Sequence, residues 1–583
     1  MKQLIEQNLI AAVARYLREK NIPPDGYTGL EIDYTKDERH GDFASNIAMT
    51  LAKSVGLPPR KIAEALIQLL PETEYLEKTE IAGPGFINFF LTKNAYLQIV
   101  PEILTAGKNY GRSDSGKGEK VLLEYVSVNP TGPIHVGHGR GAAYGSVLAR
   151  LLETAGYDVT TEFYVNDSGR QMDILAISVW LRYLDRQGMS GLNFPAKAYQ
   201  GEYVADIAGG LIQINNSLAV PEPAGLIAIL DSNIDEDKKL DDIIEFAKAS
   251  LGGKDYGLLF DFTLNRILTE IRGDLEEFGI RFDSWFSERS LHDSGAIDDC
   301  ISKLQVNGDL YEKDGAKWFR STRYGDEKDR VVVRENGQMT YFASDIAYHL
   351  NKFERGYDEM IDIWGADHHG YIGRVKGALS SLGLNAEKLK ILLVQFATLY
   401  RGKQKLQMST RSGEYVTLKE LRDEVGNDAT RFFYVTRKSE QHLDFDLDLA
   451  KSQSNDNPVY YIQYAHARIC SVFKQLRERG LDFDHDTATE HLAVLTEQHE
   501  LAMVKTLSRY SDVVLAAAKN HEPHLLAFYL RELANDFHAY YNSCQFLVDE
   551  VSVRQARLCL ITATRQVIKN GLDILGVSAP EEM

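Results

Sequence analysis

The sequence predicts a multidomain α/β protein with a doubly wound, parallel-sheet (Rossmann-like) core, an N-terminal α+β domain and a C-terminal all-helical bundle. Three observations support this prediction. The chain has 583 residues, which is too long for one core and corresponds to roughly three or four domains of about 150 residues each. Strand and helix patterns alternate between residues 116 and 400. From residue 455 onward the apolar positions recur at helical spacing, with almost no strand signal.

The composition is that of an ordinary globular protein, with 44% hydrophobic and 26% charged residues. No apolar stretch reaches the roughly 18 residues of a membrane span and no signal-peptide pattern is visible, so we expect a cytoplasmic protein with no membrane partner. The four cysteines lie far apart without a C-x-x-C pair, so neither a disulfide framework nor a structural zinc is expected. The net charge of −19 argues against non-specific coating of nucleic acid, but it leaves a shaped RNA site open.

Residues 1–115 are predicted to form a small α+β domain. Residues 63–70 have the pattern of an amphipathic helix, and residues 86–91 have that of a strand that follows a Gly-Pro-Gly turn. The polar, glycine-rich run from residue 107 to 118 reads as a linker. We therefore expect a domain boundary near residue 115.

The catalytic core is predicted over residues 116–400. Its first unit is a strand from Lys120 to about Val126, followed by a helix that begins near Gly137 and ends at Ala155, with Gly156 as the terminating glycine. A helix-dominated, acidic insertion is expected near residues 190–290. The remaining predicted strands are 158–165, 330–334, 360–364 and 389–396, and the remaining helices are 168–184, 344–353 and 371–382. Residues 401–454 are predicted to form a connecting stem region, and residues 455–583 a helical bundle.

The turn between the first strand and its helix carries the sequence His135-Val-Gly-His138. A helix that begins here directs free backbone N–H groups and its positive dipole end toward an anion above the sheet. The two histidines are three residues apart, so both can face one point, and Gly137 lets a ligand approach the backbone. Taken alone, this short motif gives equal weight to a nucleotide-phosphate site and to histidines that only cap the helix.

Five longer stretches carry a family resemblance: Glu124 to His138, Tyr341 to Asp345, Trp364 to Tyr371, Tyr460 to Arg468 and Ala563 to Val577. On these the chain resembles class I aminoacyl-tRNA synthetases, and most closely the arginyl-tRNA synthetase family, over nearly its whole length. The resemblance implies ATP-dependent ligation of L-arginine to tRNA(Arg) through an arginyl-adenylate, with release of AMP and pyrophosphate, in protein synthesis. It also implies ATP as a substrate with accompanying Mg²⁺, and we expect a monomer.

The first step implied by this resemblance joins the arginine carboxylate to the α-phosphate of ATP. The nucleophile is already ionised, so the step needs alignment and charge stabilisation rather than a general base. We therefore assign His135 and His138 as donors to the ATP phosphates, with their tautomers left open, and Gly137 as part of the ATP site.

The arginine pocket is predicted from the guanidinium group, whose planar fork of donors is best satisfied by carboxylates. Glu124 and Asp345 resemble the substrate-binding positions of the family. Asn129 resembles the residue near the substrate's backbone groups, and Tyr341 is expected beside its side chain. Each residue also has a structural interpretation: an ion pair for Glu124, a helix N-cap for Asp345 and a core position for Tyr341.

A second nucleotide contact is expected where a strand ends in Gly365-Ala-Asp367. In the class I pattern that it resembles, such a glycine and acid approach the ATP ribose, and His368 is assigned to the same site. Asp367, His368 and His369 also suggest a metal cluster, but consecutive residues diverge too much for a tetrahedral site. No protein metal site is expected.

The second class I signature is where the sequence departs from the pattern. A Lys-Met-Ser-Lys-Ser loop is typical, and here Gln407-Met-Ser-Thr-Arg-Ser-Gly413 stands before a helix signal at Thr417. Met408 and Ser409 are assigned to the ATP site. Both motif lysines are absent, and Arg411 is assigned as the catalytic cation, although Lys403 and Lys405 remain alternatives. An ordinary polar turn is the competing interpretation.

The second step requires tRNA contacts, and the resemblance implies that the C-terminal bundle reads the anticodon while the N-terminal domain touches the outer corner of the tRNA. Tyr460, Gln463, Tyr464 and Arg468 combine aromatic rings and a cation at helical spacing, as stacking on unpaired bases needs. An aromatic stripe on a helix is also typical of a core.

Two other functions compete with a ligase. A simpler nucleotidyltransferase shares the paired histidines but is usually a small single domain. A noncatalytic RNA-binding paralogue would account for the altered second signature. The intact histidines and the pocket acids favour the enzyme.

Overall fold

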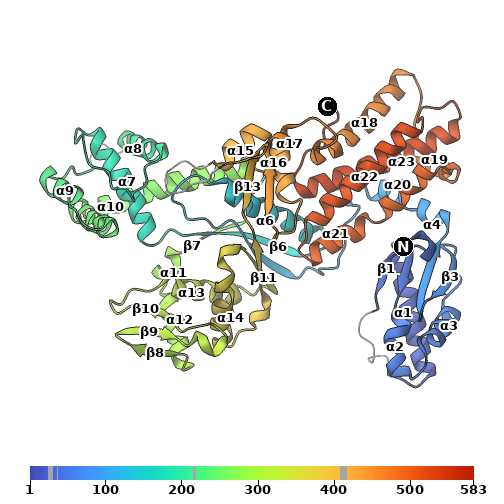
Figure 1. The fold of residues 1–583 in the computed structure, drawn as a ribbon, viewed down its shortest axis with the longest axis horizontal. Coiled ribbons are helices and arrows are strands. Elements are labelled where there is room, and N and C mark those ends of the chain that lie inside the picture. The colour runs from blue at the N-terminus through green and yellow to red at the C-terminus, as the bar shows by residue number, and fades with distance from the viewer. Residues whose placement is uncertain (24–29, 36, 215–217, 407–415) are drawn as a thin grey trace.

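The computed structural model describes residues 1–23, 30–35, 37–214, 218–406 and 416–583. The molecule is elongated, with a parallel sheet near its middle, a helical insertion at one end and a helical bundle at the other (Figure 1). The N-terminal domain lies beside the bundle. The predicted fold class is therefore confirmed: an α/β core with an N-terminal α+β domain and a C-terminal all-helical bundle.

The N-terminal domain packs helices on one antiparallel four-stranded sheet with the order β1-β2-β4-β3. The predicted helix at 63–70 and the predicted strand at 86–91 are both present, as α3 and β4. Burial of Ile62, Ala63 and Leu66 on one face of α3 explains why this amphipathic segment is a helix. The core of this domain runs from Ile5 to Ala95, whereas α5 packs into the main core of the molecule. The elements are α1 (Lys2–Glu19), β1 (Ile32–Tyr34), η2 (Glu38–His40), β2 (Phe43–Ser45), α2 (Ile47–Val55), α3 (Pro59–Leu69), β3 (Leu76–Ala82), β4 (Phe86–Leu91), α4 (Lys93–Leu97), α5 (Ile99–Ala106) and η3 (Gly107–Asn109).

The core sheet is parallel throughout, with five strands in the order β12-β11-β5-β6-β7. Its central strand β5 is buried from Val121 to Glu124, as expected for a strand covered by helices on both faces. Ligand sites in such sheets lie at the carboxyl ends of the strands. The elements are β5 (Lys120–Glu124), α6 (Val136–Thr154), β6 (Asp158–Val165), β7 (Ser284–Ser287), α11 (Arg289–Asp293), α12 (Ala296–Val306), α13 (Tyr341–Glu354), β11 (Glu359–Gly365), η5 (Ala366–Tyr371), α14 (Ile372–Ser381), η6 (Ala386–Lys388) and β12 (Leu389–Val394).

Two predicted assignments of secondary structure were wrong, one of a helical stretch and one of a strand. Residues 284–287 fall in the stretch that we expected to be helical, but they form β7, the edge strand of the parallel sheet. Residues 330–334 were expected in the parallel core, but β10 (Arg330–Val333) pairs with β9 (Ala316–Phe319) in a separate antiparallel sheet. The reason is a hairpin signal, Asp314-Gly315, whose two positive φ values close a tight turn between β8 (Leu310–Lys313) and β9. The 3-10 turn η4 (Ser321–Tyr324) lies in the connection between β9 and β10.

The first strand of the core also ends two residues earlier than predicted. Val126 and Ser127 have φ values of +70° and +40°, in the left-handed region that non-glycine residues rarely occupy. This turn ends the strand at Glu124 and sends the chain toward Asn129, above the sheet. Such backbone strain is typical of functional sites, where surrounding contacts hold it in place.

A helical insertion leaves the core after β6 and returns at β7. It forms the end of the molecule opposite the bundle (Figure 1). The long helix α10 has a non-helical residue inside it, Gly252, with φ of +69°, so it consists of two helices joined by a kink. The elements are α7 (Arg170–Arg186), α8 (Glu202–Ile214), α9 (Pro223–Leu230) and α10 (Glu236–Glu277).

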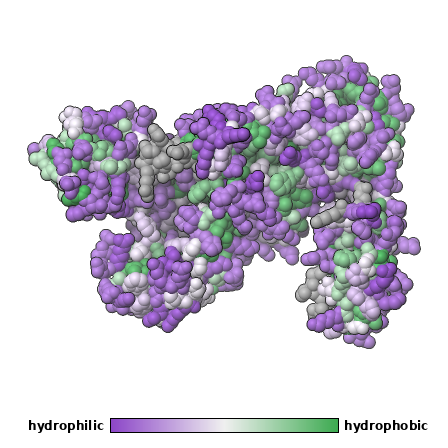
Figure 2. Space-filling model, in the orientation of Figure 1, coloured by the Kyte–Doolittle hydropathy of each residue, from purple (hydrophilic) through white to green (hydrophobic). Residues whose placement is uncertain are grey.

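The stem region and the bundle complete the molecule. Helix α15 begins with the capping box predicted at Thr417, in which the Thr417 and Glu420 side chains each bind the other residue's backbone N–H. Polar residues cover most of the face seen in Figure 2, with apolar residues in small groups. Among the described helices none is long and apolar enough to cross a membrane. The elements are β13 (Ala397–Arg401), β14 (Gln404–Lys405), α15 (Leu418–Val425), α16 (Asn427–Tyr434), β15 (Leu443–Asp446), α17 (Leu447–Lys451), α18 (Pro458–Glu478), α19 (His485–Ala488), η7 (Thr489–Val494), α20 (Gln498–Ser508), α21 (Tyr510–Lys519), α22 (His524–Ser543) and α23 (Val551–Leu575).

Candidate active site

The paired histidines lie at the start of α6, above the carboxyl end of β5. His135 is the N-cap residue, and its Nδ1 accepts a hydrogen bond from the backbone N–H of Gly137 at 3.1 Å. The imidazole rings of His135 and His138 stack with their centroids 3.6 Å apart. The two side chains therefore form one surface at the positive end of a 19-residue helix.

Both histidines are neutral at physiological pH. Burial, with a further effect of the neighbouring His135, lowers the pKa of His138 to about 3, and burial also lowers the pKa of His135. Because Nδ1 of His135 accepts a hydrogen bond, the proton of this neutral imidazole is on Nε2. His135 can therefore donate one neutral hydrogen bond from Nε2, which settles the tautomer that the sequence left open. The buried Nδ1 of His138 has no partner within the described structure.

Gly137 and Gly365 lie on either side of the exposed ring of Phe396. A Cβ atom on Gly137 would lie 3.3 Å from this ring and 2.8 Å from the His135 ring, and one on Gly365 would lie 2.5 Å from the Asp367 carboxylate and 3.5 Å from Phe396. Both positions therefore need a glycine or a rearrangement of their neighbours. Phe396 is 44% exposed at the end of β12, so its face is open to a ligand that lies across the two glycines.

Asp367 and His368 follow Gly365 in the turn η5, and both side chains are exposed. The carboxylate of Asp367 lies 3.6 Å from Nε2 of His368. Within the described parts of the chain, no group of three His, Cys, Asp or Glu side chains is placed to hold a metal ion.

The chain directly after the second signature is bonded to the first. Val136 donates its backbone N–H to the carbonyl of Val416 at 3.1 Å, and Leu418 donates to Ile134 at 2.8 Å. The signature histidines and the start of α15 thus form one rigid unit. Met408, Ser409 and Arg411, which the sequence assigned to this site, lie outside the described residues, whereas Lys403 and Lys405 are exposed at the β13–β14 turn.

Glu124 lies in a buried ion network rather than in open space. Its two carboxylate oxygens accept hydrogen bonds from Ser127 Oγ at 2.8 Å and from Lys352 Nζ at 2.5 Å. Lys352 also donates to Asp362 at 2.7 Å, and His349 binds the second oxygen of Asp362. Burial alone would raise the pKa of Asp362, but Lys352 and His349 lower it to about 2. One ammonium group thus holds two carboxylates beneath the site.

Asp345 and Glu288 are acids that lie close to each other beside this network. Asp345 is half-buried on α13 and accepts a hydrogen bond from the hydroxyl of Tyr371, and burial raises its pKa. Glu288 is only 3% exposed, and its Oε2 has no hydrogen-bond partner among the described residues. Burial, together with Asp345 and Asp167, raises the pKa of Glu288 to about 7, against the opposing hydrogen bond from Ser344. The buried hydroxyl of Tyr164 lies in the field of the same acids.

Asn129 and Tyr341 line a cavity of about 210 Å³, and Tyr341 lies one helical turn before Asp345 on α13. Tyr341, which is 58% exposed, is not part of the core, so that structural interpretation is wrong. The other lining residues come from the turn after β5 and from the β6–α7 connection: Thr131, Asn166, Ser168, Gln171 and Met172.

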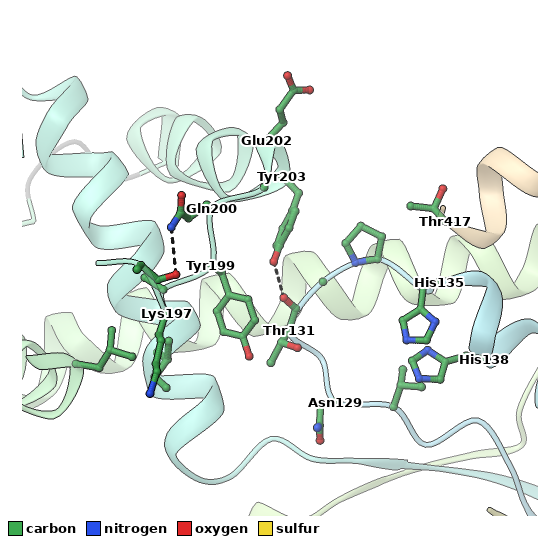
Figure 3. A pocket seen from close by; sticks show the side chains of 18 of the residues that line it. Asn129, Thr131, His135, His138, Lys197, Tyr199, Gln200, Glu202, Tyr203 and Thr417 are labelled. Atoms are coloured by element: carbon green, nitrogen blue, oxygen red, sulfur yellow. Dashed lines mark hydrogen bonds between the residues drawn. The ribbon is translucent and has the colours of Figure 1, made fainter. Parts of the chain in front are cut away.

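A second cavity, of about 1,270 Å³, extends from the two histidines to the helical insertion. Figure 3 shows His135 and His138 on one side, Asn129 and Thr131 in the centre, and Lys197 to Tyr203 on the opposite side. The Tyr203 hydroxyl donates to the backbone carbonyl of Thr131 at 2.7 Å. The insertion thus closes the site on the side opposite to α6.

The predicted tRNA contacts on α18 differ in exposure. Tyr460 and Tyr464 are half-buried and stack at 5.9 Å, and the Arg468 guanidinium lies 4.4 Å from the Tyr464 ring centroid and 4.6 Å from that of Tyr541. Gln463 is buried and donates to Asp428 at 2.8 Å and to the carbonyl of Ser578 at 3.0 Å. Tyr464 and Arg468 offer a partly open aromatic and cationic surface, whereas Gln463 ties the bundle to α16.

Sequence reasoning missed Glu288, Phe396, Lys352 and the tyrosines of the insertion. Glu288 follows β7, and identifying that strand would have placed an acid at the carboxyl end of the sheet. Phe396 stood at the end of a correctly predicted strand, but a single aromatic residue there carries no specific signal. Lys352 is on a helix interior, where sequence alone does not distinguish a buried lysine from an exposed one.

Three family models match the chain. The "Arginyl tRNA synthetase N terminal domain" matches residues 1–91, the "tRNA synthetases class I (R), catalytic domain" matches 99–192 and 246–453, and the "DALR anticodon binding domain" matches 462–583. An arginine–tRNA ligase of Thioalkalivibrio sulfidiphilus is 56% identical over 587 residues and one of Coxiella burnetii is 54% identical over 588 residues, each covering the whole of both chains.

Solved structures agree with this. A putative arginyl-tRNA synthetase of Campylobacter jejuni, at 32% identity, superposes with a TM-score of 0.73 over 85% of this chain and all of the other. The arginyl-tRNA synthetase of Thermus thermophilus, at 24% identity, shares the fold over the full length of both chains with a TM-score of 0.75. A parallel sheet with paired histidines at its first helix, matched by this catalytic model, defines a class I aminoacyl-tRNA synthetase. Within that class, the chain belongs to the arginyl-tRNA synthetase family.

Proposed function

We propose that this protein ligates L-arginine to tRNA(Arg) in two steps, using ATP and passing through an arginyl-adenylate, for protein synthesis. The observation that carries the proposal is that Asn129 and Thr131 line both the cavity at the histidines of the phosphate-facing helix start and the cavity at Tyr341, which shares its helix with Asp345. The first feature suits a nucleotide and the second suits a cationic side chain, and an amino-acid-activating enzyme must bring both together.

In the first step an oxygen of the arginine carboxylate attacks the α-phosphorus of ATP, the bond to the β-phosphate oxygen breaks, and pyrophosphate leaves. Nε2–H of His135 and the ring of His138 hold the phosphate oxygens by hydrogen bonds at the positive end of α6. Since both imidazoles are neutral, they act as fixed donors and take no proton from the substrate. The ATP base and ribose lie across Gly137 and Gly365, against the ring of Phe396, with Asp367 and His368 at the ribose.

Mg²⁺ accompanies ATP and neutralises charge on its phosphates when it is bound. Among the described residues no group of three His, Cys, Asp or Glu side chains could hold a metal ion, and Mg²⁺ would be held chiefly through the ATP that carries it. Met408, Ser409 and Arg411 remain our assignment for the pyrophosphate side, on the residue types alone.

The guanidinium group of arginine is held between Asp345 and Glu288, and Asn129 and Tyr341 line its entrance. The unpartnered Oε2 of Glu288 is an acceptor that such a donor satisfies. Glu124 acts one step further away, because Lys352 and Ser127 already occupy its oxygens. This changes the role that the sequence suggested for Glu124 from a direct contact to a support of the pocket.

In the second step a ribose hydroxyl of the terminal tRNA adenosine attacks the carbonyl carbon of the adenylate. The bond from that carbon to the phosphate oxygen breaks, AMP leaves with the electron pair, and the hydroxyl proton passes to the leaving phosphate. The bundle reads the anticodon through Tyr460, Tyr464 and Arg468, and the N-terminal domain contacts the outer corner of the tRNA. We place the protein in the cytoplasm as a monomer, where translation supplies its substrates.

Arginine-dependent exchange of pyrophosphate into ATP, measured with and without tRNA(Arg), tests this proposal together with charging of tRNA by labelled arginine. We expect charging with arginine and no charging with lysine or citrulline. A folded protein that gives neither exchange nor charging is not a ligase, and charging with another amino acid removes the arginine assignment.

A further inference from the structure

The cavity between the histidines and the insertion is larger than the proposed activation step uses. The proposed arginine site uses the cavity at Tyr341 and the neighbouring acids Asp345 and Glu288, and the proposed nucleotide surface uses Gly137, Gly365 and Phe396. The described residues that line the large cavity include none of Gly365, Asp367 and Phe396, and they include eight consecutive insertion residues, 196–203. One substrate, the tRNA, has no assigned place beside the reacting atoms.

Much of the insertion lies outside the residues that the catalytic-domain family model matches. That model matches residues 99–192 and 246–453 and omits 193–245, the stretch that contains the wall of the cavity. The residues involved come from the segment before α8 and from its first turn. The general pattern of the catalytic domain therefore does not account for what this wall contacts.

The wall has the chemistry of a nucleoside site. Tyr199 and Tyr203 are half-buried aromatic residues that stand next to each other opposite the histidines, as Figure 3 shows. Both are held in place, since the Tyr203 hydroxyl donates to the Thr131 carbonyl at 2.7 Å and the Tyr199 backbone N–H donates to Ser178 Oγ at 3.1 Å. Fixed aromatic rings are the usual platforms for unpaired bases.

The charges of the wall fit a nucleoside better than a phosphate chain. Lys197 is paired with Asp237, and Glu202 and Glu420 also line the cavity. The three carboxylates that line the cavity, those of Glu202, Asp237 and Glu420, repel phosphate groups. They accept hydrogen bonds from ribose hydroxyls and from base amino groups. A volume of about 1,270 Å³ exceeds what one nucleoside needs and leaves space for the incoming strand.

We propose that residues 196–203 of the insertion form the seat of the 3′-terminal adenosine of the tRNA, with its base on Tyr199. The inference rests on the proposed function and adds a named subsite for its third substrate. Thr131, which accepts the hydrogen bond from Tyr203, lines both this cavity and the arginine cavity together with Asn129, so an adenosine here has its ribose beside the adenylate carbonyl.

The test compares intact tRNA(Arg) with the same tRNA lacking only its terminal adenosine. Their dissociation constants are measured for the wild type, Tyr199→Leu and Tyr199→Ala, all saturated with the sulfamoyl analogue of arginyl-adenylate. In the wild type, loss of the adenosine weakens binding by between about fivefold and a hundredfold, as loss of one stacked base does. In both Tyr199 variants the two tRNAs bind within twofold of each other.

Phe194→Ala provides the matched control. Phe194 is an aromatic residue two positions before the wall. The Arg182 guanidinium lies over its ring, 4.3 Å from the ring centroid, and Phe194 is not among the described residues that line the cavity. This variant keeps the full wild-type penalty. Tyr199→Leu keeps apolar volume, whereas Tyr199→Ala leaves a gap. A second readout is the fluorescence of 2-aminopurine that replaces the terminal adenine. The wild type quenches this fluorescence and Tyr199→Leu does not.

Three results overturn the inference: an unchanged penalty in both Tyr199 variants, no penalty in the wild type, or a weaker affinity of Tyr199→Leu for the adenylate analogue itself. The last result assigns the cavity to the adenylate. Failure of the proposed function gives a different result, since the wild type then does not charge tRNA with arginine at all.

Discussion

His138 is a hydrogen-bonding group that stays neutral over the whole working pH range. Burial lowers its pKa to about 3, and the stacked His135 ring favours the neutral form further. A neutral imidazole has one donor and one acceptor, so its contribution depends on position and not on charge. The neutral state fits the proposed role of His138, in which its ring holds a phosphate oxygen by a hydrogen bond in a fixed position. It does not fit a role as a general acid.

The first prediction concerns this histidine. His138→Asn lowers the rate of arginine-dependent pyrophosphate exchange by about 10-fold to 100-fold, because a hydrogen bond to a charged oxygen contributes about 1.5–3 kcal/mol. Affinity for tRNA, measured on the same preparation, stays within twofold of wild type. Exchange at the wild-type rate removes His138 from the phosphate site.

A second prediction at the residue scale follows from Glu288, whose pKa burial raises to about 7. Below pH 7 this carboxyl is neutral and above pH 7 it is an anion, whereas the guanidinium of arginine stays a cation throughout. Arginine therefore binds better as the pH rises, and its KM falls by up to about tenfold between pH 6 and pH 8. The charged neighbours Asp345 and Asp167 face Glu288 and favour its protonated form in the free enzyme.

Glu288→Gln provides the check on this assignment. The amide cannot ionise, so the variant has a raised arginine KM that no longer changes between pH 6 and pH 8. The KM for ATP, measured in parallel, keeps its wild-type pH profile. If the arginine KM of the variant still falls with pH as in the wild type, another group carries the titration.

At the scale of elements, the buried Lys352 joins one helix to two strands of the sheet. It lies on α13 and binds Glu124 at the end of β5 and Asp362 in the middle of β11. Burial opposes its charge, but the two carboxylates reverse that effect and raise its pKa. Removing one partner from a buried ion network leaves charge without compensation, which costs about 3–5 kcal/mol.

The prediction is that Lys352→Met unfolds at a markedly lower temperature than wild type at pH 8, with a smaller difference at pH 5. Without Lys352 the pKa values of Glu124 and Asp362 rise, so the folded variant takes up protons as the pH falls and recovers part of its stability. Lys303→Met is the control. Lys303, on α12, pairs with Glu354 at the end of α13 at 3.2 Å, and both side chains are exposed. Its melting temperature changes by a degree or less at either pH.

The elements also show what the sequence could and could not predict. Strands such as β6 and β11 were predictable, because each is a short run rich in aliphatic, β-branched and aromatic residues between two helical patterns, which is typical of a parallel α/β sheet. The four residues of β7 were not, since a short strand next to a helical insertion has no periodicity of its own and is specified only by its pairing with β6. The positive φ values of Val126 and Ser127 were equally invisible, because tertiary contacts impose them.

For the site, the sequence indicated the residues and the structure shows their neighbours. The spacing of His135 and His138 in a strand-to-helix turn suggested a phosphate site, and Asn129 and Asp345 were assigned from the family resemblance; these roles stay predictions. Lys352, which changes the interpretation of Glu124, is 228 positions away in the chain, and no local pattern connects the two. Gln463 was assigned to RNA by its aromatic neighbours, whereas its amide is bonded to Asp428 and Ser578.

At the scale of the whole molecule, the short helix α16 connects the bundle to the catalytic core. The Asp428 carboxylate accepts hydrogen bonds from Gln463 on α18 and from Ser578 after α23. Tyr434, at the other end of α16, donates its hydroxyl to the carbonyl of Val136, the first residue of α6. The bundle, which we propose reads the anticodon, and the proposed activation site are therefore bonded through the eight residues of α16.

Arg431 is the centre of this connection. Its buried guanidinium donates to the Leu575 carbonyl at the end of α23, to the Phe278 carbonyl after α10 and to Ser146 Oγ on α6. Burial and the nearby Arg150 lower its pKa to about 9, so it remains charged at pH 7. The planar fork makes three bonds in three directions, which the point charge of a lysine cannot reproduce.

We expect Arg431→Lys to lower the melting temperature by several degrees and to weaken tRNA binding by about threefold to tenfold, because the bundle loses its fixed position relative to α6. Arg140→Lys is the matched control. Arg140 is also buried and donates to three carbonyls, those of Gln395, Lys438 and Gln441, but none of these belongs to the bundle. Its loss lowers stability similarly and leaves the tRNA affinity within twofold of wild type. If both variants weaken tRNA binding equally, α16 does not connect the two ends, and the effect of Arg431 is only one of stability.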